Sequence, residues 1–176
     1  MVDNPIKAYS KENSKGSFYV IQSNGNDLRY VISLNDIIKV KALIYSFIDK
    51  SKKYIQIKIR DFTNKDKPKV FTGEIIKKRL LKIIIKHKEF IFHNGFHDLM
   101  LRNPETLDYI AFDEHGLIFI YTKKDYSEIL EGFNIKFQPK SKLIYEFNHW
   151  HYSSTDSEQK LLKLVFDLGL KPENKK

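Results

Sequence analysis

The sequence predicts an α+β protein of one domain, with a mainly antiparallel sheet and helices packed on one face. Its length of 176 residues suits a single domain. Short apolar runs separated by turn residues predict neighbouring hairpins, and hairpins build antiparallel sheets. Other segments repeat apolar residues at helical spacing. We expect the domain to span residues 18–170, between a polar N-terminal arm at 1–17 and a charged tail at 171–176.

Five elements are expected in the first half of the chain. Residues 23–27 are turn formers between two β-type runs, which predicts a hairpin. A helical pattern follows, then a strand of alternating polarity, then a second helix capped by Thr72. Because residues 83–85 are β-branched, a strand is the alternative there. The expected elements are strands at Phe18–Ile21 and Arg29–Leu34, a helix at Ile37–Ile48, a strand at Tyr54–Phe62 and a helix at Gly73–Lys88.

The second half of the chain predicts two hairpins, two helices and one more strand. Asn94-Gly95 lies between the apolar-rich runs 89–93 and 96–101, and this dipeptide favours a type I′ turn. The other expected elements are a hairpin that turns at 113–116, a short helix that Asp125 caps and that runs through Leu130 to end at Gly132, a strand at Leu143–Tyr152, and a helix from the capping box Thr155-x-x-Glu158 to Gly169.

The composition excludes several kinds of site. The chain has no cysteine, so it forms no disulfide and no thiolate metal site. It has no Gly-rich phosphate loop and no GxSxG motif. The first residues lack the apolar segment of a secretory signal, and the apolar runs are too short to span a membrane. We therefore expect a cytoplasmic protein without a cofactor.

Positive charge is concentrated in one stretch of the chain. The formal net charge is +9, and residues 50–90 hold fourteen Lys or Arg against four Asp or Glu. Residues 91–176 hold eleven against thirteen. Such an asymmetric distribution attracts acidic partners. The alternative is a lysine-rich surface that only keeps the protein soluble.

The basic stretch predicts a positively charged surface. Helical spacing puts four of its side chains on one face of the second helix, and alternation puts two on the outward side of the preceding strand. Such a surface could neutralise phosphates or meet an acidic protein, whereas the alternative is a solvated helix face. The six side chains are Lys58, Arg60, Lys78, Arg79, Lys82 and Lys86.

Histidines are the remaining candidates for chemistry. Alternation along the expected strand places His149 and His151 on one face and Trp150 on the other. Histidines near a carboxylate such as Asp98 or Glu146 could bind zinc or exchange protons near neutral pH. No spacing matches a metal motif, so ring packing on half-buried strands is preferred, and no catalytic or metal-binding residue is assigned.

Three further aromatic or histidine positions have structural interpretations. His93 and His97 are expected on opposite arms of the 94–95 hairpin, and His115 is expected to serve only its turn. Either Trp150 or the neighbouring histidine pair should be exposed, because one face of the strand must be core. An exposed tryptophan would be a good interface anchor, although burial is the simpler expectation for Trp150.

The C-terminal part of the chain resembles a known class of proteins. The segment FHDLMLRNPETLDYIAFDEHGLIFIY begins at Phe96, and KLIYEFNHWHY and a capped helix follow it. Together these residues, about 97–170, resemble small immunity proteins of bacterial polymorphic-toxin and contact-dependent inhibition systems. The resemblance implies a compact α+β protein that inhibits a cognate toxin, and it identifies no functional residue. Immunity proteins against basic nucleases tend to be acidic, whereas this chain is basic. The resemblance therefore implies a toxin with an acidic surface, or one that meets the acidic C-terminal half of this chain.

These observations favour a binding protein over an enzyme. The first hypothesis is an immunity protein that occludes the active surface of a toxin domain. The second is a nucleic-acid-binding or regulatory domain that uses the basic stretch, and the third is a histidine-dependent hydrolase or nuclease. The expected partner-binding residues are Lys58, Arg60, Lys78, Arg79, Lys82, Lys86, His149, Trp150 and His151.

Overall fold

The computed structural model describes residues 6–11, 16–24, 27–64 and 66–173. Their strands are β1 (Ala8–Tyr9), β2 (Phe18–Asn24), β3 (Asp27–Ser33), β4 (Tyr54–Asp61), β5 (Lys69–Ile76), β6 (His97–Arg102), β7 (Tyr109–Phe112), β8 (Ile118–Thr122), β9 (Lys136–Phe137), β10 (Trp150–His151) and β11 (Lys171–Pro172). Their helices are α1 (Ile37–Lys50), α2 (Lys77–Lys86), α3 (Lys88–His93), α4 (Ser127–Gly132) and α5 (Ser157–Leu168), with a 3-10 turn, η1, at Ile144–Glu146.

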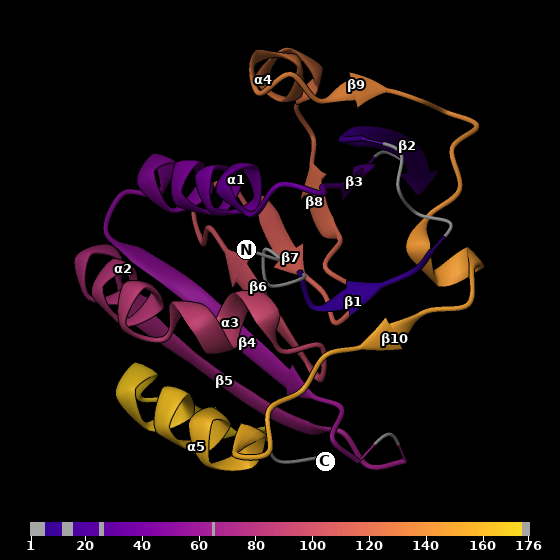
Figure 1. Cartoon of the computed structure of the whole chain (residues 1–176). Helices are drawn as coiled ribbons and strands as arrows, with labels where there is room; N and C mark the ends of the chain where they lie inside the picture. The colour runs from indigo at the N-terminus through magenta and orange to yellow at the C-terminus, as the bar shows by residue number, and fades with distance from the viewer. Residues whose placement is uncertain (1–5, 12–15, 25–26, 65, 174–176) are drawn as a thin grey trace.

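The predicted fold class is confirmed: the chain is a single α+β domain around a mostly antiparallel sheet (Figure 1). Among the described residues the sheet has nine strands in the order β11-β5-β4-β6-β7-β8-β3-β2-β9. Its pairings are antiparallel except between β2 and β9. β1 and β10 form a separate antiparallel ribbon. No helix in the described part of the chain is long and apolar enough to cross a membrane.

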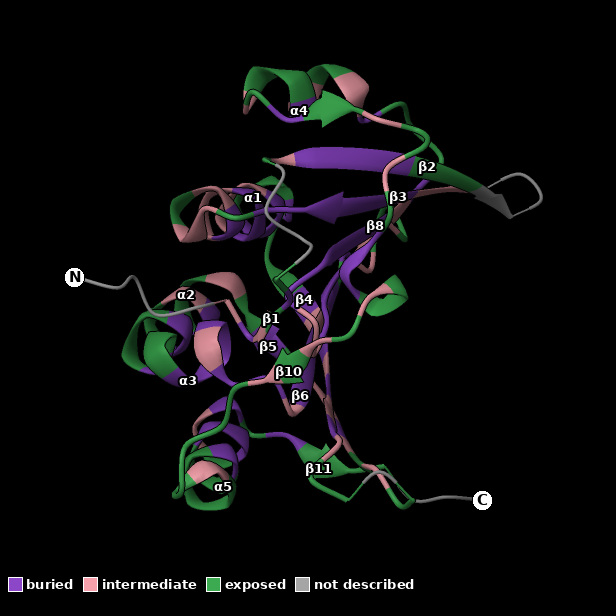
Figure 2. Cartoon of the chain, turned by 45° about the vertical axis from the view of Figure 1, so that its right-hand side comes forward, coloured by how far each residue is buried: buried purple, intermediate pink, exposed green. Residues whose placement is uncertain are grey.

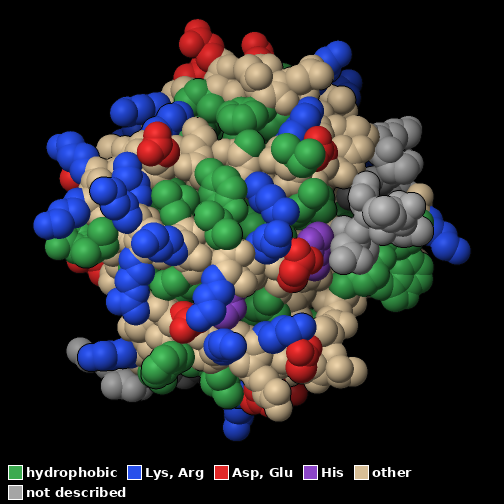
Figure 3. All heavy atoms as spheres, turned by 60° about the vertical axis from the view of Figure 1, so that its left-hand side comes forward, with side chains coloured by type: hydrophobic (Ala, Val, Ile, Leu, Met, Phe, Trp, Pro, Cys, Tyr) green, Lys and Arg blue, Asp and Glu red, His purple; other side chains and the backbone are tan. Residues whose placement is uncertain are grey.

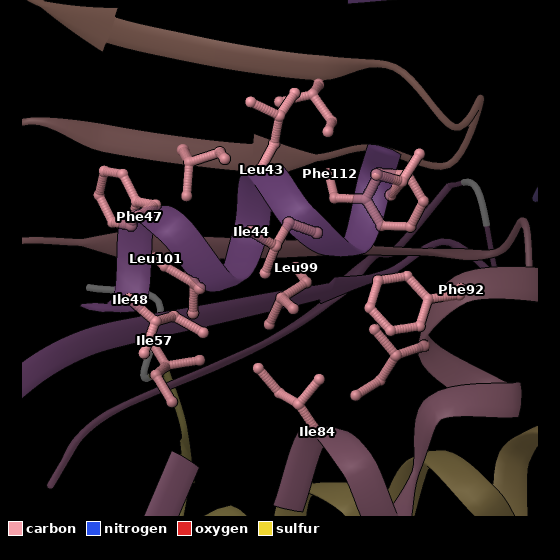
Figure 4. Close-up of a cluster of buried hydrophobic side chains, with 14 of the residues drawn as sticks. Leu43, Ile44, Phe47, Ile48, Ile57, Ile84, Phe92, Leu99, Leu101 and Phe112 are labelled. Carbon is pink, nitrogen blue, oxygen red and sulfur yellow. The ribbon is translucent and has the colours of Figure 1, made fainter. Parts of the chain in front are cut away.

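The main core lies between the sheet and one layer of helices. α1, α2, α3 and α5 lie on the same side of the sheet, with buried residues where the two layers meet (Figures 1 and 2). Alternation along β4 directs Ile55, Ile57 and Ile59 toward this layer. In Figure 4, Ile57 belongs to the same cluster as Ile84 of α2 and residues of α1. Burying each such side chain contributes about 1.5–3 kcal/mol.

A smaller cluster covers part of the opposite face of the sheet. Val31 of β3 and Phe119 of β8 pack there with Leu143 and Ile144, which enter and begin η1. The Glu146 carboxylate accepts a hydrogen bond from the Leu143 amide at 2.7 Å and closes this turn. The strand expected at Leu143–Tyr152 is therefore wrong: a 3-10 turn and the two residues of β10 replace it.

Residues 88–96 contradict the predicted Asn-Gly hairpin. Residues 88–93 form α3, and the Asn94 side chain accepts a hydrogen bond from the Phe96 amide at 2.9 Å, so 94–95 link a helix to β6. Phe90 of α3 stacks on His97 with ring centroids 4.7 Å apart. Packing of α3 into the helical layer outweighs the local turn preference of Asn-Gly.

The helix expected at Gly73–Lys88 begins four residues late, at Lys77. β5 pairs with β4 from Tyr54–Ile76 to Asp61–Lys69, so residues 69–76 complete their backbone hydrogen bonds in the sheet. Thr72 therefore lies within β5 and caps no helix, although the helical spacing of the residues after it predicted a helix that starts at Gly73. Ladder pairing with a neighbouring strand is a long-range interaction that a local pattern does not report.

Other expectations hold with shifted boundaries. The hairpin at 113–116 joins β7 to β8, with Gly116 at φ +80°. α5 ends at Gly169 in the left-handed region, but its N-cap is Asp156 without a side-chain cap bond, so the Thr155 capping box does not form. Residues 6–11 belong to the fold rather than to a polar arm, and 171–172 form β11 rather than a free tail. Residues 1–5 and 12–15 of the predicted arm, and 174–176 of the predicted tail, lie outside the described residues.

Candidate functional site

The six basic residues predicted to share one surface lie on two sides of the sheet. Lys58 and Arg60 alternate with the buried isoleucines of β4, so they are on the face away from the helical layer. The other four side chains are on α2, within that layer. The sheet separates the two groups, so the predicted surface is not continuous.

The two basic residues of β4 are neutralised by carboxylates from the C-terminal half of the chain. Lys58 Nζ lies 3.0 Å from Glu173 Oε2. Arg60 Nε donates to Asp98 Oδ2 at 2.9 Å, and the Asp98 side chain is fully buried. These two cations therefore add little to the attraction of an acidic partner.

The four basic residues predicted on one face of α2 are exposed, as the helical spacing predicts: Lys78, Arg79, Lys82 and Lys86. Five of the ten residues of α2 are Lys or Arg and none is acidic. Lys86 pairs with Asp167 at 2.7 Å, and Arg79 donates to the Asp167 carbonyl oxygen at 2.8 Å. Lys78 and Lys82 make no ion pair with a carboxylate of the described residues. Figure 3 shows Lys and Arg side chains over much of this helical face, with Asp and Glu between them.

His149 and His151 meet a third histidine, His115, from the turn between β7 and β8. The ring centroids are 4.9 Å apart for 115–149, 5.0 Å for 115–151 and 5.2 Å for 149–151. One ring nitrogen of each histidine lies within 4.8 Å of one nitrogen of the other two. We call these three residues the histidine cluster.

Each ring of the histidine cluster is oriented by an oxygen atom at its Nδ1. His115 Nδ1 lies 3.1 Å from Asp113 Oδ2. His149 Nδ1 lies 2.8 Å from the Phe147 carbonyl oxygen, and His151 Nδ1 lies 3.0 Å from that of Glu114. Carbonyl and carboxylate oxygens only accept, so Nδ1 carries the proton and Nε2 of a neutral ring keeps its lone pair.

The histidine cluster lines a surface pocket of about 280 Å³, together with Phe62, Gly95, Phe96 and Glu114. Burial would lower the pKa of His115, but its hydrogen bond to Asp113 and the charges of Asp113 and Glu114 outweigh burial and raise it. Burial and then the charge of His115 lower the pKa of His151. Imidazoles in such a pocket can coordinate a transition metal or exchange protons near neutral pH.

A buried lysine lies close to the carboxylates near this pocket. Lys7 is fully buried, and its Nζ donates to the His97 carbonyl oxygen at 2.6 Å. Burial lowers the pKa of Lys7 to about 8, although the negative charges of Asp98, Asp113 and Glu114 act to raise it.

The neighbouring carboxyl of Asp98 is also perturbed. Burial and then Glu114 raise the pKa of Asp98, although the positive charges of Lys7 and Arg60 act to lower it. Asp98 also accepts a hydrogen bond from the Glu114 amide at 2.9 Å, which fixes the turn that carries His115.

Trp150 lies between His149 and His151 but is exposed, contrary to its expected burial. Trp150 is 56% exposed, and its ring stacks on that of Tyr9, which is 46% exposed, with ring centroids 6.3 Å apart. Both residues belong to the β1–β10 ribbon, where Tyr9 pairs with Trp150 and Ala8 with His151 (Figure 1). The Tyr152 amide donates to the Lys7 carbonyl oxygen at 2.8 Å, so the ribbon is tied to the buried lysine.

The sequence patterns did not indicate His115, Lys7 or Tyr9 as residues of a functional site. The Asp-Glu-His-Gly turn was recognisable, but nothing local shows that its histidine meets residues 149–151. Conversely, Glu146 closes η1, and His97 packs under Phe90, so neither joins the histidine cluster.

Comparisons with known proteins identify no relative of this chain. No protein-family model matches this chain, and neither a curated protein nor a solved structure shows significant similarity to it.

Proposed function

We propose that this protein is a non-enzymatic binding protein, an immunity protein that neutralises a toxin domain by covering its active surface. The observation that carries the proposal is the exposed, stacked pair of Tyr9 and Trp150 on the β1–β10 ribbon. Tryptophan and tyrosine are enriched among the residues that dominate binding energy at protein interfaces. An exposed pair of them on a protein surface favours a contact site for another protein.

The position of the pair is set before any partner arrives. β1 and β10 pair in register, and the buried Lys7 anchors the ribbon from below. A rigid anchor loses little side-chain entropy on binding, so more of its contact energy is retained as affinity. The ribbon therefore suits tight occlusion of a defined surface.

The basic face of α2 favours an acidic toxin surface. Lys78 and Lys82 are exposed and make no ion pair with a carboxylate of the described residues, and the chain has a net charge of +9. Electrostatic attraction acts over roughly 8 Å at physiological salt and mainly raises the association rate. The lysines can therefore speed capture while the aromatic pair supplies affinity.

The test uses the product of the gene immediately upstream, which the proposal expects to be a toxin. The two proteins are mixed, and their stoichiometry and affinity are measured by size-exclusion chromatography and calorimetry. We expect a one-to-one complex that protects cells expressing the toxin. Trp150→Ala should weaken binding at least about thirtyfold, because loss of a central aromatic anchor costs about 2 kcal/mol or more.

The matched control is Phe166→Ala, which removes an aromatic ring of 82% exposure from α5. It should change the affinity less than about twofold, since an exposed ring outside the interface contributes little to binding. A neighbouring toxin that forms no complex, or equal affinities for wild type and Trp150→Ala, would contradict the proposal.

Nucleic-acid binding is the second candidate, supported by the absence of acidic residues from α2. With three phosphate contacts, from Lys78, Arg79 and Lys82, affinity for mixed-sequence DNA should fall about fortyfold between about 50 and 200 mM salt. The double variant Lys78→Glu/Lys82→Glu should abolish binding, while Lys123→Glu/Lys124→Glu, also exposed, should weaken it less. Fluorescence anisotropy measures both, and no binding at low salt rejects this candidate.

A further inference from the structure

We propose that His115, His149 and His151 bind one divalent transition-metal ion, with Zn²⁺ the best match, through their Nε2 atoms. This site goes beyond the proposed binding function and does not depend on it. Three features of the molecule support it: the three rings converge, an oxygen atom lies at each Nδ1, and carboxylates surround the cluster.

The rings are already close to the spacing that a metal requires. A nitrogen of each lies within 4.8 Å of a nitrogen of the other two. In tetrahedral zinc sites Zn–N is 2.0–2.1 Å, which sets ligand nitrogens about 3.3 Å apart. All three side chains are partly exposed, so small rotations can close the remaining distance.

The Nδ1 contacts provide an independent argument for a metal. Histidines that bind metals almost always donate their other ring N–H to a carboxylate, a carbonyl or water, which fixes the tautomer and the ring direction. Here Asp113 holds His115, and backbone carbonyl oxygens hold His149 and His151. Three rings packed only for their apolar surface would not need the same nitrogen to be held in each.

The electrostatic surroundings favour a cation. Neutral rings this close bring their nitrogen lone pairs near one another, which is electrostatically unfavourable, and a metal ion removes that cost. Asp113 and Glu114 flank His115, and Asp98 lies near enough to act on it as well. Lys7 and Arg60 offset part of this negative charge from the side of Asp98. The net balance at the cluster still suits a dication.

The donor atoms select the type of metal. Three imidazoles suit Zn²⁺, Cu²⁺ or Ni²⁺, whereas Mg²⁺ and Ca²⁺ prefer sites made of oxygen atoms. Three protein ligands leave a fourth position, and the pocket of about 280 Å³ gives it access to solvent. Glu114 lines the same pocket, so water or this carboxylate can complete the tetrahedron.

A bound ion would add bonds between two parts of the chain that are far apart in sequence. The 113–116 turn meets the segment around His151 through the hydrogen bond from His151 to the Glu114 carbonyl oxygen. Bonds from one ion to His115, His149 and His151 would lock that segment, and with it β10, onto the turn. Zn²⁺ should therefore raise the thermal stability of the wild-type protein.

The test titrates the full chain, with any affinity tag removed, with Zn²⁺ and with Co²⁺. We expect one Zn²⁺ per chain by calorimetry and the intense visible absorption of four-coordinate Co²⁺. His149→Ala, at a partly exposed loop position, should weaken Zn²⁺ binding at least about a hundredfold. It should also abolish the Zn²⁺-dependent rise in melting temperature. His93→Ala, a histidine outside the cluster, is the matched control and should bind as wild type does.

A second variant tests the orientation of His115 without removing a ligand. Asp113→Asn keeps an acceptor for the His115 and Leu117 amides, but it can place an NH₂ group against His115 Nδ1. Zn²⁺ affinity should fall about 10–100-fold. The site is rejected if wild type binds no stoichiometric Zn²⁺, if His149→Ala binds equally well, if His93→Ala loses binding, or if Co²⁺ is six-coordinate. None of these readouts needs a partner protein, so they fail independently of the proposed function.

Discussion

Lys7 Nζ donates a hydrogen bond to the carbonyl oxygen of His97 at 2.6 Å, joining residues ninety positions apart. The ammonium also lies 4.3 Å from the centre of the Phe112 ring. The carbonyl oxygen of Lys7 accepts from the Tyr152 amide, so one residue connects β6 to the ribbon that carries Trp150. The shape of the candidate interface therefore depends on a buried cation.

Removing this side chain should destabilise the fold. Lys7→Ala deletes a buried cation and leaves nearby carboxylates without one of their counter-charges, so the free energy of unfolding should fall by about 3 kcal/mol. Lys11→Ala, at an exposed position, should change it by less than about 0.5 kcal/mol. Urea unfolding at pH 7 measures both, and similar values for the two variants would show that Lys7 is not an anchor.

The buried lysine also predicts a pH dependence. Burial lowers the pKa of Lys7 to about 8 from 10.5, so above pH 8 the unfolded chain holds a proton that the folded chain has released. Stability rises with pH wherever the unfolded state binds more protons. The unfolding free energy of wild type, relative to Lys7→Met, should therefore increase between pH 8 and 10.5, by on the order of 1–3 kcal/mol. A constant or falling difference over that range would be the wrong sign.

Gly95 tests the close approach beneath the ribbon. A Cβ at this position would collide with the Lys7 carbonyl oxygen and press on the His151 ring. Gly95→Ala should therefore cost about 1–3 kcal/mol and alter the fluorescence of Trp150. Gly132→Ala is the control, because a Cβ there has no neighbour within 4 Å. It should be neutral or stabilise by up to about 1 kcal/mol, and equal melting temperatures for the two variants would contradict this packing.

Two ion pairs on the open face of the sheet should differ in their importance. Asp98→Ala leaves Arg60 without its buried partner and should cost about 3–5 kcal/mol. Glu173→Ala breaks the exposed pair with Lys58 and should cost less than about 1 kcal/mol. Denaturation at low and high salt measures both losses. A Glu173 variant that loses as much as the Asp98 variant would refute the distinction.

Local sequence patterns correctly predicted the elements whose structure depends mainly on residues close together in the chain. The helix expected at Ile37–Ile48 is α1, the alternating strand is β4, and Gly116 and Gly169 end their elements with positive φ. These features depend on periodicity and on backbone conformations open to few residues, both of which can be read within about ten positions. The exposure of Lys78, Arg79, Lys82 and Lys86 follows from the same helical spacing.

Other features arise only where distant segments meet. Asn94-Gly95 reads as a turn, yet α3 precedes it, because its packing in the helical layer outweighs the local preference. The basic stretch reads as one surface, yet the sheet divides it, and Glu173 and Asp98 neutralise the half on β4.

The sequence by itself determined the fold class, the helix α1, the strand β4 and the net positive charge. These features follow from the composition and from the spacing of apolar residues within short segments. Only the tertiary structure decided that Lys7 is buried, that Trp150 stacks on Tyr9, and that His115 meets His149 and His151. Each of these contacts joins residues more than thirty positions apart. No local pattern specifies such a contact, because it forms only after the core has brought the segments together.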